Sequence, residues 1–363
     1  MSGPQPRPGI LDIAPYIPGE SKAEGHREPL KLASNESSLG PSPRAIAAYR
    51  AMAERLHRYP DGASADLRAA IAKHHGLDPA RIVCGNGSDE LIGLLTKAYA
   101  GPGDEVVFTE HAFAMYPIAT LAAGARPVVA KEKNLRADVD ALIAKVTDRT
   151  RIVFQANPNN PTGSYLTKEE IERLHKALPE RVLLVIDAAY AEYVTRNDYT
   201  AGMDLAAKAP NVVMTRTFSK IYGLAGLRLG WMYGPAPVVD AINRTRGPFN
   251  VTLPAQAAGV AALADVAHVD LARTNNDHML AWFSAEVKAL GLEVPPSVGN
   301  FVLVRFPKAN GKDANAANDF LLKRGIIPRK VGGYGLPDCL RITIGLEAEM
   351  RATVAALADF VKS

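Results

Sequence analysis

The feature that most constrains this chain is a set of apolar runs of strand length, each followed by a polar or glycine-rich turn. Residues 181–187 form such a run, and its only acid, Asp187, stands at the carboxyl end. A continuous apolar run is typical of a parallel strand that is covered on both faces. Similar runs at 151–156 and 81–84 also precede polar motifs. Because open α/β sheets bind ligands at the carboxyl ends of their strands, we expect these motifs to meet at one edge of a sheet.

The order of runs predicts the fold class and the domains. From about residue 46 to 264, strand-like runs alternate with helical patterns, which favours an α/β fold with a mostly parallel sheet between helices. A long helical pattern at about 254–290 then leads into strand-like runs at 301–306 and 339–345, which indicates a smaller α+β domain. The predicted parts are an N-terminal arm (1–30), a large domain (46–264) and a small domain (31–45 and 265–363).

Lys220 is the candidate for covalent chemistry. It is one of 42 lysines and arginines, most of which we expect to be solvated surface charges, but Ser219 precedes it and Arg228 follows in the same run. A lysine amine adds to an aldehyde to form a Schiff base, and a pyridoxal ring then withdraws electrons from a substrate carbon. One loop therefore offers an amine, a hydroxyl and a guanidinium, which suits pyridoxal 5'-phosphate.

Asp187 and Tyr190 are candidates for the pyridoxal ring. The ring nitrogen needs a buried carboxylate if it is to stay protonated, and Asp187 ends a strand that is expected to be buried. A helix N-cap is the alternative role for this aspartate. Tyr190, three residues on, offers a phenol to the cofactor's 3-oxygen and favours the first interpretation.

Two further turns follow predicted strands. Residues 85–90 read Gly-Asn-Gly-Ser-Asp-Glu before an amphipathic stretch, and a glycine turn at a helix start can bind phosphate. Taken alone this signal is weak, and the turn lacks the Gly-Lys-Ser/Thr ending of a Walker loop. Residues 157–163 read Asn-Pro-Asn-Asn-Pro-Thr-Gly, where Asn160 presents an amide to the 3-oxygen and ordinary turn chemistry is the alternative.

Arg341 is the candidate anchor for an anionic substrate. Strand alternation over residues 339–345 places Arg341 on the same face as Thr343 and Gly345. Arginine binds carboxylate or phosphate through two parallel hydrogen bonds. The alternative is an edge-strand arginine that faces solvent.

In their order and spacing these motifs resemble the fold type I pyridoxal phosphate aminotransferases, and most closely the histidinol-phosphate aminotransferases among them. The resemblance covers almost the whole chain and includes further stretches at 32–36, 39–43, 58–62 and 248–251. The chain departs from the family at 34–38, Ser-Asn-Glu-Ser-Ser, where Glu-Asn-Pro is more common, and at Phe113, where some members have tyrosine. Neither departure removes a reactive group, but both leave fine substrate preference open.

The resemblance implies a role for each matching residue. Lys220 would bond covalently to the cofactor, Asp187 would pair with the pyridine nitrogen, and Tyr190 and Asn160 would bond the 3-oxygen. Phe113 would stack on the ring. The phosphate would be surrounded by Gly87, Ser88, Asp89, Ser219 and Arg228. Tyr59 would reach the phosphate of a second subunit, which implies a homodimer, and Asp89 would use its backbone amide because its carboxylate would repel the phosphate.

The cofactor residues alone do not distinguish transamination from decarboxylation or β-elimination. The resemblance implies a ping-pong aminotransferase of histidine biosynthesis that acts on L-histidinol phosphate and 2-oxoglutarate. Its substrate residues would be Tyr16, Asn35, Arg329 and Arg341, with both arginines and Tyr16 forming a phosphate clamp. An aromatic amino acid aminotransferase of the same family remains an alternative. A decarboxylase of a phosphorylated amino acid and a non-catalytic cofactor-binding protein are less favoured, the latter because Lys220 and Asp187 are both present.

The composition of the chain argues against several classes of binding partner. The 363 residues carry a formal net charge of +4 without a block of lysine and arginine, so no nucleic-acid partner is expected. No run of 18 apolar residues and no apolar leader segment occur, and we expect a cytoplasmic protein without a membrane partner. Cys84 and Cys339 lie in apolar segments and are expected to stay reduced. No His-Glu-x-x-His or Cys-x-x-Cys spacing occurs, and no metal site is expected.

Overall fold

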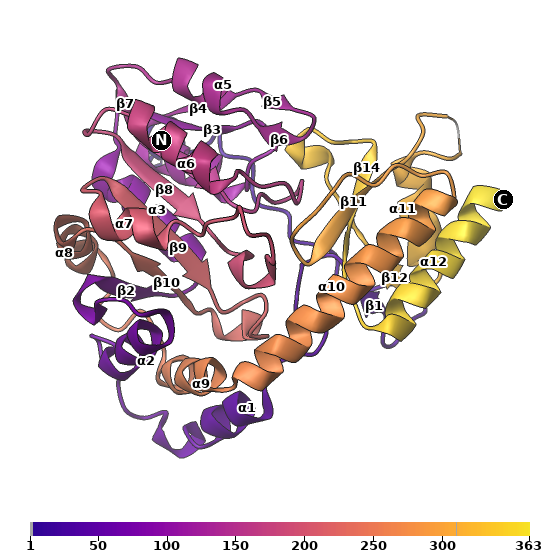
Figure 1. Ribbon diagram of the computed structural model, residues 1–363, viewed down its shortest axis with the longest axis horizontal. Helices are drawn as coiled ribbons and strands as arrows, with labels where there is room; N and C mark the ends of the chain where they lie inside the picture. Colours follow the sequence, from indigo (N-terminus) through magenta and orange to yellow (C-terminus); the bar gives the residue numbers. More distant parts are fainter. Residues whose placement is uncertain (1–2, 310) are drawn as a thin grey trace.

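A seven-stranded sheet forms the centre of the larger part of the molecule (Figure 1). The structure is a computed structural model that describes residues 3–309 and 311–363. In sheet order the strands are β2 (Ile82–Gly85), β10 (Gly230–Tyr233), β9 (Val212–Thr217), β8 (Leu183–Asp187), β7 (Thr150–Ala156), β3 (Glu105–Thr109) and β4 (Arg126–Ala130). Strand β10 pairs antiparallel with β2 and β9, and the other pairs are parallel. The predicted mostly parallel sheet is confirmed.

Helices cover both faces of this sheet, and the side chains of β8 show why. Leu183 and Val185 point into one buried cluster, while Leu184 and Ile186 point into the other, as the two-residue period of a strand requires. The first face is covered by α3 (Ser88–Tyr99), α4 (Met115–Ala123) and α8 (Ala236–Thr245). The second face is covered by α2 (Ala65–His75), α5 (Val139–Ala144), α6 (Lys168–Ala177), α7 (Met203–Lys208) and α9 (Leu253–Ala264).

A smaller α+β part follows towards the C-terminus, drawn in orange and yellow in Figure 1. Its antiparallel sheet has the order β11 (Phe301–Arg305), β14 (Cys339–Thr343) and β13 (Arg329–Lys330). Helices α10 (Val266–Ala289), α11 (Ala314–Leu322) and α12 (Glu347–Lys362) pack with it around a separate cluster that contains Phe283, Val302 and Leu340. Strand β1 (Leu30–Lys31) joins this part by pairing in parallel with β12 (Ile326–Ile327).

Short elements complete the chain. Helix α1 (Pro43–Arg50) packs against α9, and β5 (Glu132–Lys133) pairs with β6 (Arg136–Ala137). Single 3-10 turns are η1 (Ala53–Arg55), η2 (Pro79–Arg81), η3 (Ala191–Tyr193), η4 (Ala225–Leu227) and η5 (Gly332–Tyr334).

The long helical pattern at 254–290 is two helices, α9 and α10, that meet at Asp265. The backbone of this residue leaves the helical region, with φ −96° and ψ 64°. Its amide still donates to the Ala262 carbonyl, and its own carbonyl accepts from Val269, so both helix ends keep hydrogen bonds. Neither glycine nor proline marks the break in the sequence. The division into arm, large and small domains at 1–30, 31–45, 46–264 and 265–363 is our proposal. Separate apolar clusters support two domains, but Ala45, Ala272 and Phe301 of the proposed small domain pack into the cluster of the large one.

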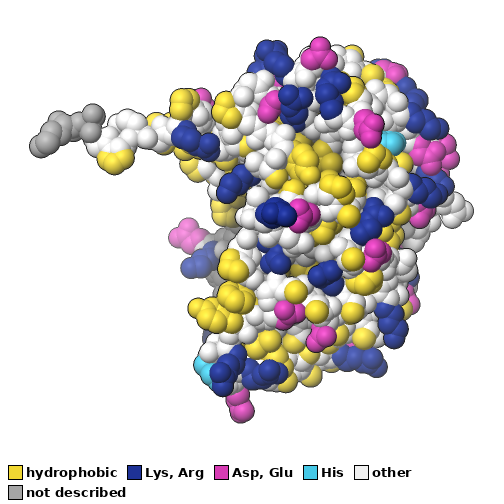
Figure 2. All heavy atoms as spheres, turned by 90° about the vertical axis from the view of Figure 1, so that its left-hand side faces the viewer, with side chains coloured by type: hydrophobic (Ala, Val, Ile, Leu, Met, Phe, Trp, Pro, Cys, Tyr) yellow, Lys and Arg dark blue, Asp and Glu magenta, His cyan; other side chains and the backbone are white. Residues whose placement is uncertain are grey.

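The first described residues of the N-terminal arm project from the body in Figure 2, and no helix or strand occurs between residues 3 and 29. One anchor is the Arg7 guanidinium, which donates to the Ala122 carbonyl on α4 at 2.5 Å. Among the helices that the structure describes, none has the length and apolarity needed to cross a membrane.

Candidate active site

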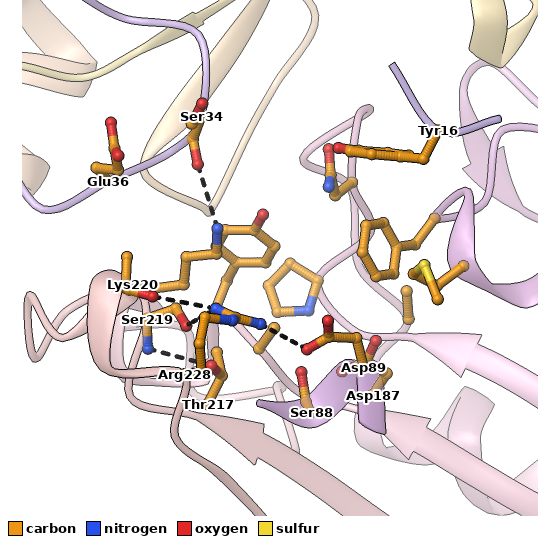
Figure 3. A pocket seen from close by; sticks show the side chains of 18 residues that line it. Tyr16, Ser34, Glu36, Ser88, Asp89, Asp187, Thr217, Ser219, Lys220 and Arg228 are labelled. Atoms are coloured by element: carbon orange, nitrogen blue, oxygen red, sulfur yellow. Dashed lines mark hydrogen bonds and ion pairs between the residues drawn. The ribbon is translucent and has the colours of Figure 1, made fainter. Parts of the chain in front are cut away.

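A cavity of about 360 Å³ opens at the carboxyl ends of β7, β8 and β9, where the strands end at Ala156, Asp187 and Thr217 (Figure 3). The predicted residues that line it are Tyr16, Ser88, Asp89, Phe113, Asn160, Asp187, Tyr190, Ser219, Lys220 and Arg228. An adjoining cavity of about 140 Å³ shares Lys220 and Tyr190 and adds the predicted substrate residues Asn35, Arg329 and Arg341. Gly87 directly precedes Ser88, whereas Tyr59 lines neither cavity.

Asp187 is held by side chains on both oxygens. It is 5% exposed, and its carboxylate accepts hydrogen bonds from Tyr116 Oη at 2.8 Å and Thr215 Oγ1 at 3.0 Å. Burial raises the pKa of Asp187, while both hydrogen bonds act in the opposite direction. The helix N-cap alternative is wrong, because side chains and not helix amides occupy the carboxylate.

Sequence reasoning missed Tyr116 and Thr215 as partners of Asp187. Tyr116 is fully buried and stacks on Phe154 with ring centres 4.6 Å apart, so its hydroxyl has a fixed direction. The bond joins residues 71 positions apart, and no local pattern reports such a contact. One available signal was spacing, since Tyr116 follows Phe113 by three positions at the start of a helix.

Lys220 has few partners for a buried amine. Its Nζ atom lies 3.3 Å from the Ser34 carbonyl oxygen and 5.5 Å from the ring centre of Tyr190. Burial, and next the positive charge of Arg341, lower the pKa of Lys220 to about 8. A substantial fraction of this amine is therefore neutral near physiological pH, which is the form that attacks an aldehyde.

A group of anion-binding donors lies at the start of α3. Gly87 is the N-cap residue with φ +86°, and a Cβ atom there would collide with the Asp89 carboxylate and the Arg228 guanidinium. Arg228 Nη2 pairs with Asp89 at 2.7 Å, and Arg228 Nη1 donates to Ser219 Oγ at 3.4 Å. Backbone amides at a helix start, hydroxyls and a guanidinium together match a phosphate group. With Lys220 and Asp187 nearby, these residues fit pyridoxal 5'-phosphate.

Tyr190 is tied to the small sheet through Asn35. Its hydroxyl accepts a hydrogen bond from Asn35 Nδ2 at 2.9 Å. The backbone N–H of Asn35 donates to Thr343 Oγ1, also at 2.9 Å. Tyr190 is 3% exposed, and burial raises its pKa. Because the oxygen already accepts a hydrogen bond, its own proton remains available for donation.

Arg341 lies on the central strand of the small sheet and is 5% exposed, so the alternative of a solvent-facing edge arginine is wrong. Its guanidinium donates to Asn160 Oδ1 and to the Ala33 carbonyl, the latter at 2.6 Å. Its Nε atom is buried without a hydrogen-bond partner in the described part of the chain. Burial lowers the pKa of Arg341. A buried guanidinium with an unused donor favours an incoming anion.

Arg329 and Tyr16 form the more open side of the smaller cavity. Arg329 Nη2 donates to the Ile17 carbonyl at 2.6 Å, and the guanidinium lies 5.9 Å from the Tyr16 ring centre. Tyr16 is 48% exposed. The N-terminal arm thus passes over the cavity and meets β13 there.

Tyr59 and the cysteines lie outside this group. Tyr59 is 81% exposed and stacks on Phe249 with ring centres 4.6 Å apart. Cys84 and Cys339 are free and buried, and burial raises their pKa to about 12 and about 11. Within residues 3–309 and 311–363, no cluster of three His, Cys, Asp or Glu side chains has the arrangement to hold a metal ion.

Comparisons with known proteins place the chain in a family. The model for "Aminotransferase class I and II" matches residues 27–357. The chain is 60% identical over 362 residues to a histidinol-phosphate aminotransferase of Rhodospirillum centenum, covering 100% of both chains. It is 58% identical to that of Paramagnetospirillum magneticum, covering 99% of both.

A solved structure agrees with these sequence matches. The histidinol-phosphate aminotransferase of Sinorhizobium meliloti, crystallised with pyridoxal-5'-phosphate, is 32% identical, with a TM-score of 0.91. The match covers 99% of this chain and 98% of that one. The resemblance predicted from the motifs is confirmed: the chain belongs to the class I and II aminotransferases, enzymes that use pyridoxal 5'-phosphate.

Proposed function

We propose that this enzyme transfers an amino group between L-histidinol phosphate and 2-oxoglutarate, in histidine biosynthesis. The observation that carries the proposal is the pair of guanidinium groups, Arg341 and Arg329, beside Lys220 in one small cavity. A phosphate dianion gains from two guanidinium groups, and each charge-assisted hydrogen bond contributes roughly 1.5–3 kcal/mol. The full-length relatives that carry this activity in their names support the same substrate.

The wall formed by the large sheet would hold the cofactor, which supplies an electron sink when bound. Asp187 would keep a proton on the ring nitrogen, and Tyr190 would donate its free hydroxyl proton to the 3-oxygen. Asn160 accepts from Arg341 through Oδ1, so its side-chain nitrogen would be free to donate to the 3-oxygen. Phe113 would stack on the ring. The phosphate would be held by Gly87, Ser88, Asp89, Ser219 and Arg228.

The expected role of the Asp89 carboxylate is refined by its contact with Arg228. We expected only the backbone amide of Asp89 to serve the phosphate, because a carboxylate would repel it. The 2.7 Å ion pair instead uses that carboxylate to orient the Arg228 guanidinium. The negative charge of Asp89 is thereby compensated on the side that faces the site.

Lys220 is the proposed general base. With cofactor and substrate bound, its neutral Nζ would accept the proton that leaves the substrate α-carbon and would later release it. A pKa of about 8 suits this exchange at neutral pH, because both protonation states are populated. Two such half-reactions at one site predict ping-pong kinetics.

Arg341, Arg329, Tyr16 and Asn35 form the proposed substrate side. Arg341 lies deepest, fixed by Asn160 and the Ala33 carbonyl, and suits either the α-carboxylate of glutamate or one side of the phosphate of histidinol phosphate. Arg329 and Tyr16 lie further out, where a phosphate on a longer arm would reach them. The Asn35–Tyr190 hydrogen bond connects this side with the cofactor wall.

We also propose a cytoplasmic homodimer in which Tyr59 reaches the phosphate site of the neighbouring subunit. The support within one chain is the 81% exposure of Tyr59, whose ring is already oriented by stacking on Phe249. Free buried thiols such as Cys84 suit a reducing compartment.

A substrate panel tests the proposed reaction. With 2-oxoglutarate as acceptor, kcat/KM should be higher for L-histidinol phosphate than for phenylalanine, tyrosine or aspartate. A higher value for phenylalanine or tyrosine would establish the aromatic aminotransferase alternative instead. Carbon dioxide release from a phosphorylated amino acid would indicate a decarboxylase.

A further inference from the structure

A buried ion pair lies outside the cavities described above and takes no part in the steps above. Arg216 Nη2 and Glu192 Oε1 are 2.8 Å apart, and the two side chains are only 5% and 8% exposed. Neither residue lines a described cavity. The pair therefore contacts neither the substrate side nor the cofactor side directly.

The positions of the two residues along the chain are informative. Glu192 lies in η3, the turn that begins directly after Tyr190. Arg216 lies on β9 between Thr215, which binds Asp187, and Thr217, which ends the strand before Lys220. The ion pair thus joins the turn that carries Tyr190 to the strand that leads to Lys220.

Backbone bonding between these segments stops before Tyr190. The last ladder-type bond runs from the Ala188 amide to the Thr215 carbonyl, and none of the described backbone bonds joins residues 189–192 to β9. The η3 turn has three residues and one-turn 3-10 geometry, which holds poorly by itself. On the strand side, the Arg216–Glu192 contact is the polar clamp on this turn.

Stability alone does not account for the pair. Arg216 Nε and Nη2 both donate to Glu192 Oε1, at 3.2 and 2.8 Å, and Oε2 is buried without a partner in the part of the chain described. Such half-satisfied buried pairs are commonly no more stable than apolar residues of similar volume. What the pair supplies, and apolar residues would not, is a fixed distance and direction.

The titratable groups around the pair carry little charge near pH 7. Burial raises the pKa of Tyr199 and of Tyr222, and burial lowers the pKa of His75 to about 3, so all three are neutral near pH 7. Burial also lowers the pKa of His74. Although burial alone would lower the pKa of Arg216, the Glu192 carboxylate keeps it raised. Near pH 7 the two charges compensate mainly each other.

We propose that Arg216 and Glu192 are a positioning pair, which holds the Tyr190 hydroxyl at its working distance from Lys220 and from the 3-oxygen of the cofactor. The inference rests on the proposed role of Tyr190. It adds that the alignment of this phenol depends on a salt bridge behind the site and not only on Asn35 in front of it.

The test uses cofactor-saturated protein without an amino substrate. The reference is Tyr190→Phe, and the test variant is Arg216→Met/Glu192→Leu, which removes both charges together. The control is Arg244→Met/Asp240→Leu, an ion pair of the same 2.8 Å length whose side chains are 75% and 62% exposed. The measurements are the pH midpoint of the visible absorption change of the bound cofactor, the cofactor Kd and Tm.

We expect the double variant to shift this midpoint upward, as Tyr190→Phe does. The visible absorption of the bound cofactor changes when the proton shared between its 3-oxygen and the Lys220 nitrogen is lost. A phenol that donates to the 3-oxygen stabilises the negative charge left by that loss. Without the phenol, the proton is therefore lost only at higher pH. One hydrogen bond to a charged oxygen predicts a shift of about 1–2 pH units. Added to Tyr190→Phe, the double variant should shift the midpoint no further. The exposed control pair should leave it unchanged.

Single variants separate charge from position. Glu192→Gln leaves an uncompensated guanidinium and should lower the midpoint, whereas Arg216→Met leaves a carboxylate and should raise it. Opposite shifts that cancel in the double variant would show that the pair acts only through charge, and would overturn the proposal. Arg216→Lys keeps the charge but loses the fork geometry, and should reproduce a smaller upward shift even if the double variant does not fold.

Two other outcomes also decide the matter. The double variant could have a lower Tm and weaker cofactor binding, yet keep the wild-type pH midpoint when it is saturated with cofactor. In that case the pair is structural and the proposal is wrong. If Tyr190→Phe itself leaves the midpoint unchanged, the proposed role of Tyr190 fails, and the positioning role fails with it. A substrate panel that favours phenylalanine would overturn the proposed substrate but leave this inference standing.

Discussion

The two walls of the cavity are built differently. On the wall of the large sheet, Asp187 is 5% exposed, and both of its oxygens are bonded by side chains from α4 and β9. On the opposite side, Arg329 lies on a two-residue strand and contacts Tyr16, a half-exposed residue of the arm. One wall is fixed before any ligand arrives, whereas the other depends on a segment without regular structure.

This difference matches two tasks. A cofactor stays bound through many turnovers, and fixed dipoles around it need no reorganisation during the reaction. The proposed amino substrates differ in length and in the type of anion, so their wall has to accept both. We therefore expect changes in the sheet wall to affect every substrate equally, and changes in the arm wall to affect substrates unequally.

The largest expected effect is that of Lys220→Ala. Loss of the proposed general base should reduce turnover by at least about 10²- to 10⁴-fold with every amino donor. Borohydride treatment of the wild type should fix the cofactor on the peptide that contains Lys220, as peptide mapping would show. Lys131→Ala, which removes an exposed lysine, is the control. A reduced adduct on another lysine would contradict the assignment.

Asp187→Asn should retain cofactor but reduce turnover roughly 10- to 100-fold for all donors, because a charge-assisted hydrogen bond to the ring nitrogen is lost. Burial raises the Asp187 pKa, so the stability linked to its protonated form is lost as pH rises through that raised pKa. The cofactor-free Asn variant should therefore have a higher Tm than wild type at pH 7. Undiminished turnover would reject the role of Asp187.

Arg329→Ala tests the arm wall. We expect kcat/KM for histidinol phosphate to fall about 10- to 100-fold, and that for phenylalanine to fall less. Lys330→Ala, which removes the neighbouring exposed cation, is the matched control. Equal losses for both donors would show that Arg329 serves a carboxylate or the structure.

The pH dependence of cofactor binding tests the sheet side without any substrate. Burial lowers the pKa of Lys220 to about 8, so the neutral amine predominates above that pH. The rate of reconstitution from cofactor-free protein should rise about tenfold between pH 7 and pH values well above 8, and then level off. Stopped-flow absorbance measures it. A rate that keeps rising towards pH 10 would indicate an ordinary lysine.

The smallest signal comes from mixed dimers. Once Tyr59→Ala is shown to be strongly impaired, its mixture with Lys220→Ala should recover roughly a quarter of wild-type activity, since half of random dimers are hybrids with one intact site. Native mass spectrometry would confirm the hybrids. Hybrids without activity would exclude a contribution of Tyr59 to its neighbour.

Site residues in local sequence motifs were predictable, whereas partners distant in the sequence were not. Asp187 was predicted because it ends an apolar run of strand length. Lys220 was predicted because a serine directly precedes it and an arginine follows in the same run. Both patterns can be recognised from a few neighbouring residues. Tyr116 was missed because its bond to Asp187 exists only after α4 packs on the sheet. Arg216 was missed because the sequence around it gives no local sign of its partner, Glu192, 24 positions earlier.

The fold was predictable to a similar depth. Strand alternation and turns predicted the mostly parallel sheet and the α+β part, since both patterns are local. The break at Asp265 was not predicted, because neither glycine nor proline marks the point where the backbone leaves the helical region. The domain boundaries and the role of Tyr59 stay predictions, since each depends on relations that one chain's local pattern does not contain.

The antiparallel strand β10 has a consequence for how the enzyme is made. It pairs Gly230 with Gly85 on one side and with Thr217 on the other, and a Cβ at Gly230 would collide with the Ser88 backbone. The lysine-bearing loop and the phosphate-binding turn thus come together only when a late segment of the chain returns to an early one. Contacts of such long sequence separation form slowly, because a large loop must close first. A partly synthesised or partly refolded chain would therefore not bind the cofactor. The appearance of the absorbance of bound cofactor would show that the sheet is complete.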